Sequence, residues 1–320
     1  MPFFSRTAAV VATFSLAFGF ISPVVAQEPV QSGGTISTQV SLVSLFATVR
    51  DKNKRIVTDM TQNDFKIFQD NEEQKVAFFS KEVTMPITLG LLIDTSGSEQ
   101  YRLPAEQDAA SRFLDRVMKK GDEAMVISFD LDVDLLSDFT DDKHIIERAI
   151  NKAKVNAVGG GGVVTPGTIP SNVGGTHFYD AVYLACSEKL GTEAGRKALI
   201  IITDAQDEGS KTRLEEAVEA AQRADAVVHI LWVHDGPYGR FDVAKKLAEE
   251  TGGRAIDVSN EKKLEQAFDQ ISEELRSQYQ IGYYYPANKA KDGGFRKIRV
   301  DIANKDYKVL ARRGFYAPKG

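Results

Sequence analysis

Cysteine is almost absent from this chain of 320 residues, in which Cys186 is the one example. A single thiol cannot form an internal disulfide, so the fold must be stabilised by its hydrophobic core. We interpret Cys186 as a small buried apolar residue of a helix rather than as a reactive thiol. Histidine is also scarce, and the four histidines lack the spacing of zinc ligands. These absences exclude a disulfide-stapled scaffold and give no support to a zinc site.

Long runs of one charge are absent as well. Forty Lys and Arg residues are scattered among 45 Asp and Glu residues, which gives a net charge of -5. A nucleic-acid-binding surface needs clustered basic residues, so nucleic acid is not expected as a partner. With 42% apolar and 27% charged residues, the chain is too apolar to be disordered and long enough for one or two globular domains.

One uncharged run stands out, and it lies at the N-terminus. Arg6 is followed by a mostly apolar stretch that ends in small residues at Ala26. These features predict a signal peptide over residues 1–26, followed by a linker over 27–38. A membrane anchor fits less well, because the strongly apolar part is short and Pro23 interrupts it. The mature protein is therefore expected to be exported, periplasmic or secreted, with no stable membrane anchor.

Strand and helix patterns alternate over residues 86–278. Residues 89–93 and 197–202 are continuous apolar runs, which are typical of strands covered on both faces. Amphipathic stretches, with apolar residues three and four positions apart, lie between such runs. This alternation predicts an α/β domain with a doubly wound, mostly parallel sheet.

Segments with β-strand patterns flank this domain, at residues 39–85 and 279–320. In the first, residues 65–68 and 76–79 are expected to pair around a turn. Neither flank is large enough for a core of its own, so we predict that both pack into one β-sandwich.

Two further segments carry predictions of their own. Of Tyr283, Tyr284 and Tyr285, alternate side chains are expected to face the sandwich core, with a binding surface as the alternative. Residues 156–175, with four consecutive glycines, predict a mobile loop.

Side chains that carry oxygen follow the predicted strands. Asp94, Ser96 and Ser98 come directly after the run at 89–93, and Thr203 and Asp204 follow the run at 197–202. The loops at the carboxyl ends of the strands line the binding crevice of a doubly wound sheet. We therefore expect these side chains to meet in that crevice.

A third loop completes the candidate site. Thr176 follows two glycines and precedes a predicted helix, and Asp180 is expected to orient this loop. Carboxylate and hydroxyl oxygens without His or Cys suit a hard divalent ion such as Mg²⁺ or Mn²⁺, and they admit Ca²⁺. If the acids act mainly through water, the ion keeps much of its charge and an open position for an outside anion. The predicted metal ligands are Asp94, Ser96, Ser98, Thr176 and Asp204, with Asp180 and Thr203 in support.

Together these pieces resemble a known domain. The Asp-x-Ser-x-Ser pattern from Asp94, the Gly-Gly-Thr-x-x-x-Asp stretch from Gly174 to Asp180, and Thr203-Asp204 are similar to the metal-ion-dependent adhesion site of a von Willebrand factor type A (VWA) domain. The resemblance covers roughly residues 88–277, and the flanks resemble exported VWFA-related proteins of acidobacteria. It implies a VWA fold and a partner whose Asp or Glu carboxylate completes the metal coordination. One departure is Ala205, where the family often has glycine, which affects the shape of the loop but removes no ligand.

Enzyme chemistry finds little support. Ser96 lacks the flanking glycines of a nucleophile elbow, and the glycine spacing at 162–168 has Thr168 where a phosphate-binding loop requires lysine. We therefore predict a non-enzymatic, exported module that captures an acidic group of a protein partner through its metal ion. The alternative is a metal-independent structural or assembly protein of the cell envelope, with a degenerate VWA site.

Overall fold

The computed structural model describes residues 41–81, 85–155, 175–234, 236, 239–286, 289–317 and 319. The predicted signal peptide, the linker and residues 156–174 of the predicted mobile loop lie outside the described residues. Within the described ranges, no helix is both long enough and apolar enough to cross a membrane.

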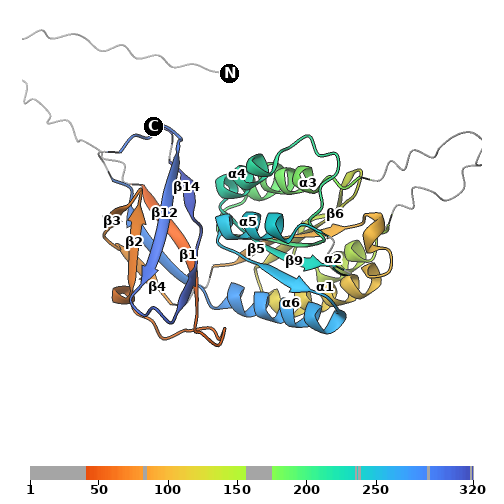
Figure 1. The fold of residues 1–320 in the computed structure, drawn as a ribbon, viewed down its shortest axis with the longest axis horizontal. Coiled ribbons are helices and arrows are strands. Elements are labelled where there is room, and N and C mark those ends of the chain that lie inside the picture. The colour runs from red at the N-terminus through yellow and green to blue at the C-terminus, as the bar shows by residue number, and fades with distance from the viewer. Residues whose placement is uncertain are drawn as a thin grey trace, which may run out of the picture. The chain divides into compact units, whose positions relative to one another are not determined.

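A six-stranded sheet forms the middle layer of the α/β domain (Figure 1). Its strand order is β10-β9-β8-β5-β6-β7, and all neighbours are parallel except β6 and β7. The strands are β5 (Ile87–Asp94), β6 (Glu123–Phe129), β7 (Val133–Thr140), β8 (Arg196–Thr203), β9 (Ala226–Val233) and β10 (Ala255–Val258). The antiparallel edge strand β7 was not among the predicted strands, because it is only partly buried and carries no continuous apolar run. The mostly parallel, doubly wound sheet confirms the predicted fold class.

Helices cover both faces of this sheet (Figure 1). One core contains residues of α1, α2 and α6, and the other contains residues of α3, α4 and α5. The helices are α1 (Leu103–Val117), α2 (Lys143–Ile150), α3 (Phe178–Leu184), α4 (Leu214–Ala224), α5 (Phe241–Thr251) and α6 (Glu261–Arg276). A π-helical turn, Ala185–Lys189, continues α3 and buries Cys186, as the sequence predicts.

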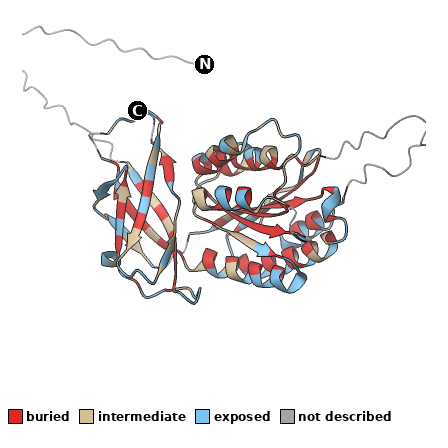
Figure 2. Ribbon diagram, in the orientation of Figure 1, coloured by how far each residue is buried: buried red, intermediate tan, exposed pale blue. Residues whose placement is uncertain are grey.

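Apolar residues on both sides of the central strands explain this three-layer arrangement (Figure 2). In β5, Leu91 and Ile93 point into the core that α1 and α6 close, whereas Leu92 points into the opposite core. On α6, apolar residues three and four positions apart face the sheet, and Phe268 stacks on Phe113 of α1 with ring centroids 4.7 Å apart. The continuous apolar run and the helical periodicity therefore fix which surfaces are buried.

The flanking segments form two four-stranded sheets that share one hydrophobic core. One sheet has the order β13-β1-β11-β4, and the other has the order β14-β12-β2-β3. The strands are β1 (Leu42–Arg50), β2 (Phe65–Gln69), β3 (Glu72–Gln74), β4 (Phe78–Ser80), β11 (Tyr279–Tyr284), β12 (Phe295–Ile302), β13 (Lys308–Leu310) and β14 (Gly314–Tyr316). Strands from both ends of the chain meet in each sheet, which confirms the predicted β-sandwich.

The alternation of the tyrosines follows from this arrangement. Tyr283 and Tyr285 are buried in the sandwich core, while Tyr284 is 59% exposed. The Tyr283 hydroxyl donates to the Gln69 side-chain oxygen at 2.9 Å, so the polar end of the ring is satisfied inside the core.

The predicted pairing of residues 65–68 with 76–79 is wrong. Strand β2 pairs instead with β3 through a tight turn at Asp70 and Asn71, both of which have positive φ angles, of 50° and 69°. Asn and Asp tolerate this conformation better than other residues with a side chain. The chain then crosses to the other sheet, where β4 pairs with β11.

Candidate metal centre

The topology places two strand ends at the centre of the sheet. From β5 the chain moves to β6 on one side, and it later returns to β8 on the other side of β5. Such a switch point leaves a crevice outside the carboxyl ends of the two strands. Asp94 ends β5 and Thr203 ends β8, and the Thr203 hydroxyl donates a 2.6 Å hydrogen bond to Oδ2 of Asp94. Two of the predicted site residues are therefore in direct contact.

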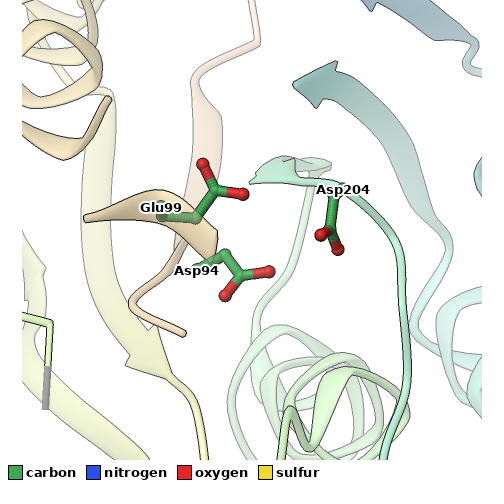
Figure 3. A group of neighbouring side chains, drawn as sticks. All are labelled: Asp94, Glu99 and Asp204. Carbon is green, nitrogen blue, oxygen red and sulfur yellow. The ribbon is translucent and has the colours of Figure 1, made fainter. Parts of the chain in front are cut away.

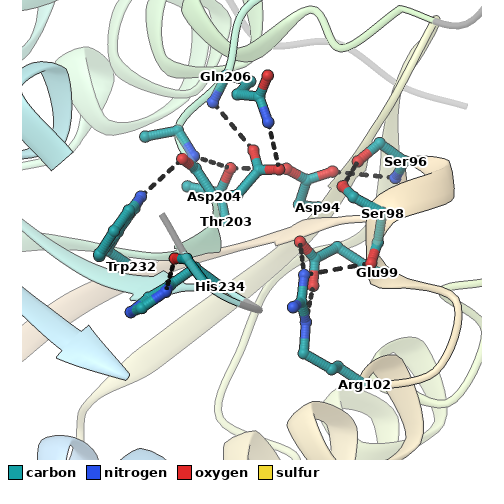
Figure 4. Close-up of polar contacts among 12 residues, drawn as sticks. Asp94, Ser96, Ser98, Glu99, Arg102, Thr203, Asp204, Gln206, Trp232 and His234 are labelled. Carbon is teal, nitrogen blue, oxygen red and sulfur yellow. Dashed lines mark hydrogen bonds and ion pairs between the residues drawn. The ribbon is translucent and has the colours of Figure 1, made fainter. Parts of the chain in front are cut away.

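The serines of the first loop lie beside Asp94 (Figure 4). The backbone N–H of Ser96 donates to Oδ1 of Asp94 at 2.9 Å, and the Oγ atoms of Ser96 and Ser98 are 3.0 Å apart. Ser96 is buried and Ser98 is exposed. The loop thus presents a hydroxyl pair at the open end of β5.

Asp204 is held by the loop that follows β8. Its Oδ1 accepts the backbone N–H of Gln206, and its Oδ2 accepts the Gln206 side-chain amide, both at 3.0 Å. Its carbonyl oxygen accepts the Trp232 indole N–H at 2.8 Å (Figure 4). The next residue, Ala205, is fully buried and has a φ of 60°, a left-handed conformation that favours glycine. The alanine at this position thus carries local backbone strain.

Thr176 and Asp180 lie against the same loop, further along it. The backbone of Thr176 exchanges two hydrogen bonds with Glu208, at 3.1 and 2.9 Å. The carboxylate of Asp180, in the first turn of α3, accepts the backbone N–H groups of Lys211 and Thr212, at 3.0 and 2.8 Å. These contacts agree with an orienting role for Asp180, and they place Thr176 beside the residues that follow Asp204.

A third acid, Glu99, lies with Asp94 and Asp204, and the sequence analysis missed it. One carboxylate oxygen of each acid lies within 4.8 Å of the others (Figure 3). The short 3₁₀ turn Gly97–Glu99 leaves Ser98 exposed and buries Glu99 completely. Arg102 binds both Glu99 oxygens, through Nη2 at 2.9 Å and Nε at 3.0 Å. The signal in the sequence was the acid that directly follows the Asp-x-Ser-x-Ser pattern.

Glu106 is a fourth buried acid in this region, with 1% of its surface exposed. As a carboxylate it has no donor among the described residues, but in its protonated form it hydrogen-bonds to Glu99. Its place on α1 was readable from the sequence, because it precedes the buried Ala109, Ala110 and Phe113 at helical spacing. Burial, and then the carboxyl of Glu99, raise the pKa of Glu106 well above its ordinary value.

The cluster carries more negative charge than its partners offset. Burial, and then the nearby Glu99, raise the pKa of Asp94 to about 7. Burying several carboxylates together is costly unless cations pair with them, and a divalent ion would offset this charge at close range. The nearby donors are hard carboxylate and hydroxyl oxygens, so the residues fit an ion such as Mg²⁺, Mn²⁺ or Ca²⁺.

Comparisons with known proteins agree with this fold. Residues 89–208 match the family model of the von Willebrand factor type A domain. The fold is similar to that of a von Willebrand factor type A protein from Catenulispora acidiphila, with a TM-score of 0.50 and 12% identity over 81% of this chain and 75% of that one. The fold is also similar to that of proximal thread matrix protein 1 from the mussel byssus. The structure of that protein is described as having a zinc-occupied MIDAS (metal-ion-dependent adhesion site) motif. That match has a TM-score of 0.50 and 18% identity over 65% of this chain and 50% of that one.

This chain therefore spans about half of the length of the byssus protein. No curated protein matches the chain.

The doubly wound sheet, with acids and hydroxyls at its switch point, defines this part of the chain as an α/β domain. The family match identifies residues 89–208 as a von Willebrand factor type A domain. The finer resemblance of the flanks to exported acidobacterial proteins stays a prediction.

Proposed function

We propose that this protein is an exported binding module that captures an acidic group of a protein partner through a divalent metal ion. The observation that carries the proposal is the cluster at the switch point, where carboxylate oxygens of Asp94 and Asp204 approach each other closely beside the Ser96 and Ser98 hydroxyls. The protein ligands of the ion would be Asp94, Ser96, Ser98, Thr176 and Asp204.

The chemistry of the donors supports a binding role over catalysis. The Ser96 hydroxyl lies 3.0 Å from that of Ser98 and contacts the Asp94 carboxyl, so oxygen ligands of the kind a hard metal ion prefers are gathered here. A divalent ion held by neutral hydroxyls and few direct carboxylates keeps positive charge and attracts an anionic ligand. The Asp or Glu side chain of a partner is the commonest such group on a protein surface.

The segment that follows Ser98 offers a further contact for such a partner. Tyr101 lies three residues after Ser98, and 91% of its surface is exposed. An exposed tyrosine ring supplies contact area at low entropic cost, and tyrosine is enriched at protein interfaces. A partner that places a carboxylate on the ion would be positioned to cover this ring.

Thermal unfolding with different metals tests the metal site. Melting temperature would be measured in EDTA, Mg²⁺, Mn²⁺, Ca²⁺ and Zn²⁺ for the wild type and for Asp94→Ala. A ligand at 100 times its Kd stabilises the folded state by about 2.7 kcal/mol, which raises the melting temperature by several degrees. We expect a rise in the wild type that the variant loses, and the size of the rise ranks the metals.

The same variant separates the proposal from its alternative. If no metal raises the melting temperature, or if a partner pulled down by the wild type also binds Asp94→Ala equally well, the protein is a metal-independent structural or assembly protein. Export has its own test, which is N-terminal sequencing of the mature chain. A mature chain that begins at Gln27 supports export, whereas one that retains Arg6 contradicts it.

A further inference from the structure

Glu99 lies between Arg102 and the two acids Asp94 and Asp204. Its carboxylate is bound through both oxygens by Arg102, while one of its oxygens lies within 4.8 Å of ligand oxygens of Asp94 and Asp204. An ion held by those two acids would therefore be within reach of a small rotation of the Glu99 side chain (Figures 3 and 4).

The charge distribution around Glu99 favours such an exchange. Glu106, buried on α1, lies next to Glu99, and its protonated carboxyl hydrogen-bonds to the Glu99 carboxylate, which keeps Glu99 charged. A divalent ion attracts the Glu99 carboxylate more strongly than a single guanidinium does. The Arg102 side chain is 18% exposed, so water can solvate its charge when Glu99 leaves.

From these contacts we infer that Glu99 is an internal ligand that alternates between Arg102 and the metal ion, where it occupies the position otherwise open to the partner's carboxylate. The inference rests on the proposed function, because it requires an ion at Asp94 and Asp204. With Glu99 on Arg102 the site is open to an outside acid, and with Glu99 on the ion the site is closed by the protein itself. Arg102 thus sets the fraction of molecules that can bind the partner, and the apparent affinity falls with that fraction.

Mn²⁺ alone is a sufficient probe, because a carboxylate that joins the ion displaces a bound water. Titration calorimetry gives the affinity, and water proton relaxation gives the number of waters on the bound Mn²⁺. For Glu99→Gln we expect at least tenfold weaker Mn²⁺ binding and about one more bound water. For Arg102→Met, which keeps every acid but frees Glu99, we expect severalfold tighter binding and fewer bound waters.

Three further variants make the outcome specific. Glu99→Asp keeps the charge on a shorter side chain, so it should resemble Glu99→Gln if Glu99 is a ligand and the wild type if only its charge matters. Asp108→Asn removes an exposed acid two residues after Glu106 and should leave both measurements unchanged. Because Arg102→Met shifts both measurements in the direction opposite to Glu99→Gln, it tests the inference even if a Glu99 variant fails to fold.

Failure of the inference differs from failure of the proposed function. If the wild type binds no Mn²⁺, or binds it as well as Asp94→Ala does, the metal-dependent function is wrong and the inference falls with it. If Asp94→Ala loses Mn²⁺ while Glu99→Gln and Arg102→Met keep the wild-type affinity and water number, only the internal ligand is disproved.

Discussion

The side chain of Arg50 donates a 2.8 Å hydrogen bond to Oε1 of Glu274, which lies 224 residues later in the chain. Arg50 ends β1 of the sandwich, and Glu274 lies in the last turn of α6 of the VWA domain. Arg254 forms a second ion pair with the same oxygen, at 2.9 Å. The Glu274 side chain is only 2% exposed. One buried carboxylate therefore pairs with two guanidinium groups and links the two halves of the fold.

Removing this carboxylate should be severely destabilising. Glu274→Gln leaves the charges of Arg50 and Arg254 without their partner in a buried site, which costs about 3–5 kcal/mol. Urea unfolding followed by circular dichroism measures this loss. The control is Glu265→Gln, whose pair with Arg112 is half exposed and should contribute no more than about 1 kcal/mol. Equal effects of the two substitutions would show that the buried network contributes little.

Because of His229, we expect the folded protein to lose stability in acid. It is completely buried in β9, and burial, followed by the charges of Arg254 and Arg50, lowers its pKa to about 3. Oε2 of Glu274, 3.6 Å from Nδ1, favours the charged ring, but the two arginines already compete for that carboxylate. We therefore expect the ring to stay neutral.

The direction of this pH dependence follows from the difference between the pKa of His229 in the unfolded chain and in the folded chain. The unfolded chain takes up a proton near pH 6.5 and the folded chain only near pH 3, so this contribution is complete above pH 6.5 and is lost as the pH falls. Relative to His229→Leu, the wild type should lose about 2 kcal/mol between pH 6.5 and 5. Unfolding at several pH values measures this, with the exposed His144→Gln as the control. Parallel stability curves for wild type and His229→Leu would contradict it.

Ala205→Gly should stabilise the protein. The left-handed conformation at Ala205 costs about 1–2 kcal/mol for a residue with a Cβ, and glycine adopts it freely. Part of this gain is offset because glycine makes the unfolded chain more flexible and because the buried methyl group is lost, so we expect a small net gain, below about 0.5 kcal/mol. By contrast, Ala220→Gly inside α4 should cost about 1 kcal/mol. A destabilising Ala205→Gly would mean that the loop gains more from the methyl group than it loses in strain.

Cys186 should be chemically inert in the folded protein. It is fully buried, and burial raises the pKa of its thiol to about 12, so thiolate is scarce at neutral pH. A thiol reagent such as DTNB should react with it only at the rate of unfolding, and rapidly in denaturant. Stoichiometric labelling of native protein within minutes would contradict the buried position.

How far the sequence predicts this structure depends on the range of each interaction. The strand at Ile87–Asp94 follows from its own apolar residues, because both of its faces are covered, and its last residue carries the acid that the motif indicates. Strand β4 could not be assigned correctly, since its partner β11 lies about two hundred residues away and no local pattern encodes that pairing.

The site shows the same limit. Asp94, Ser96, Ser98 and Asp204 could be named because each follows a recognisable strand. Glu99 was readable only as an acid that directly follows the motif, and its place in the site was not, because its burial depends on a single 3₁₀ turn that points it inward while Ser98 points outward. If the turn were shifted by one residue, Ser98 would point inward and Glu99 outward. Amino-acid composition does not determine the position of the turn.

The pairing of β4 with β11 has an architectural consequence. Ser80, at the end of β4, lies directly opposite Gln280, near the start of β11, so the chain leaves and re-enters the sandwich at adjacent points. Neighbouring strands place such residues about 5 Å apart, a gap that a short hairpin turn spans. The whole VWA domain is thus an insertion into a β-hairpin. The sandwich therefore holds the inserted domain by two chain connections that lie side by side. Another domain whose two ends lie close together could be inserted at the same points without changing a sandwich strand.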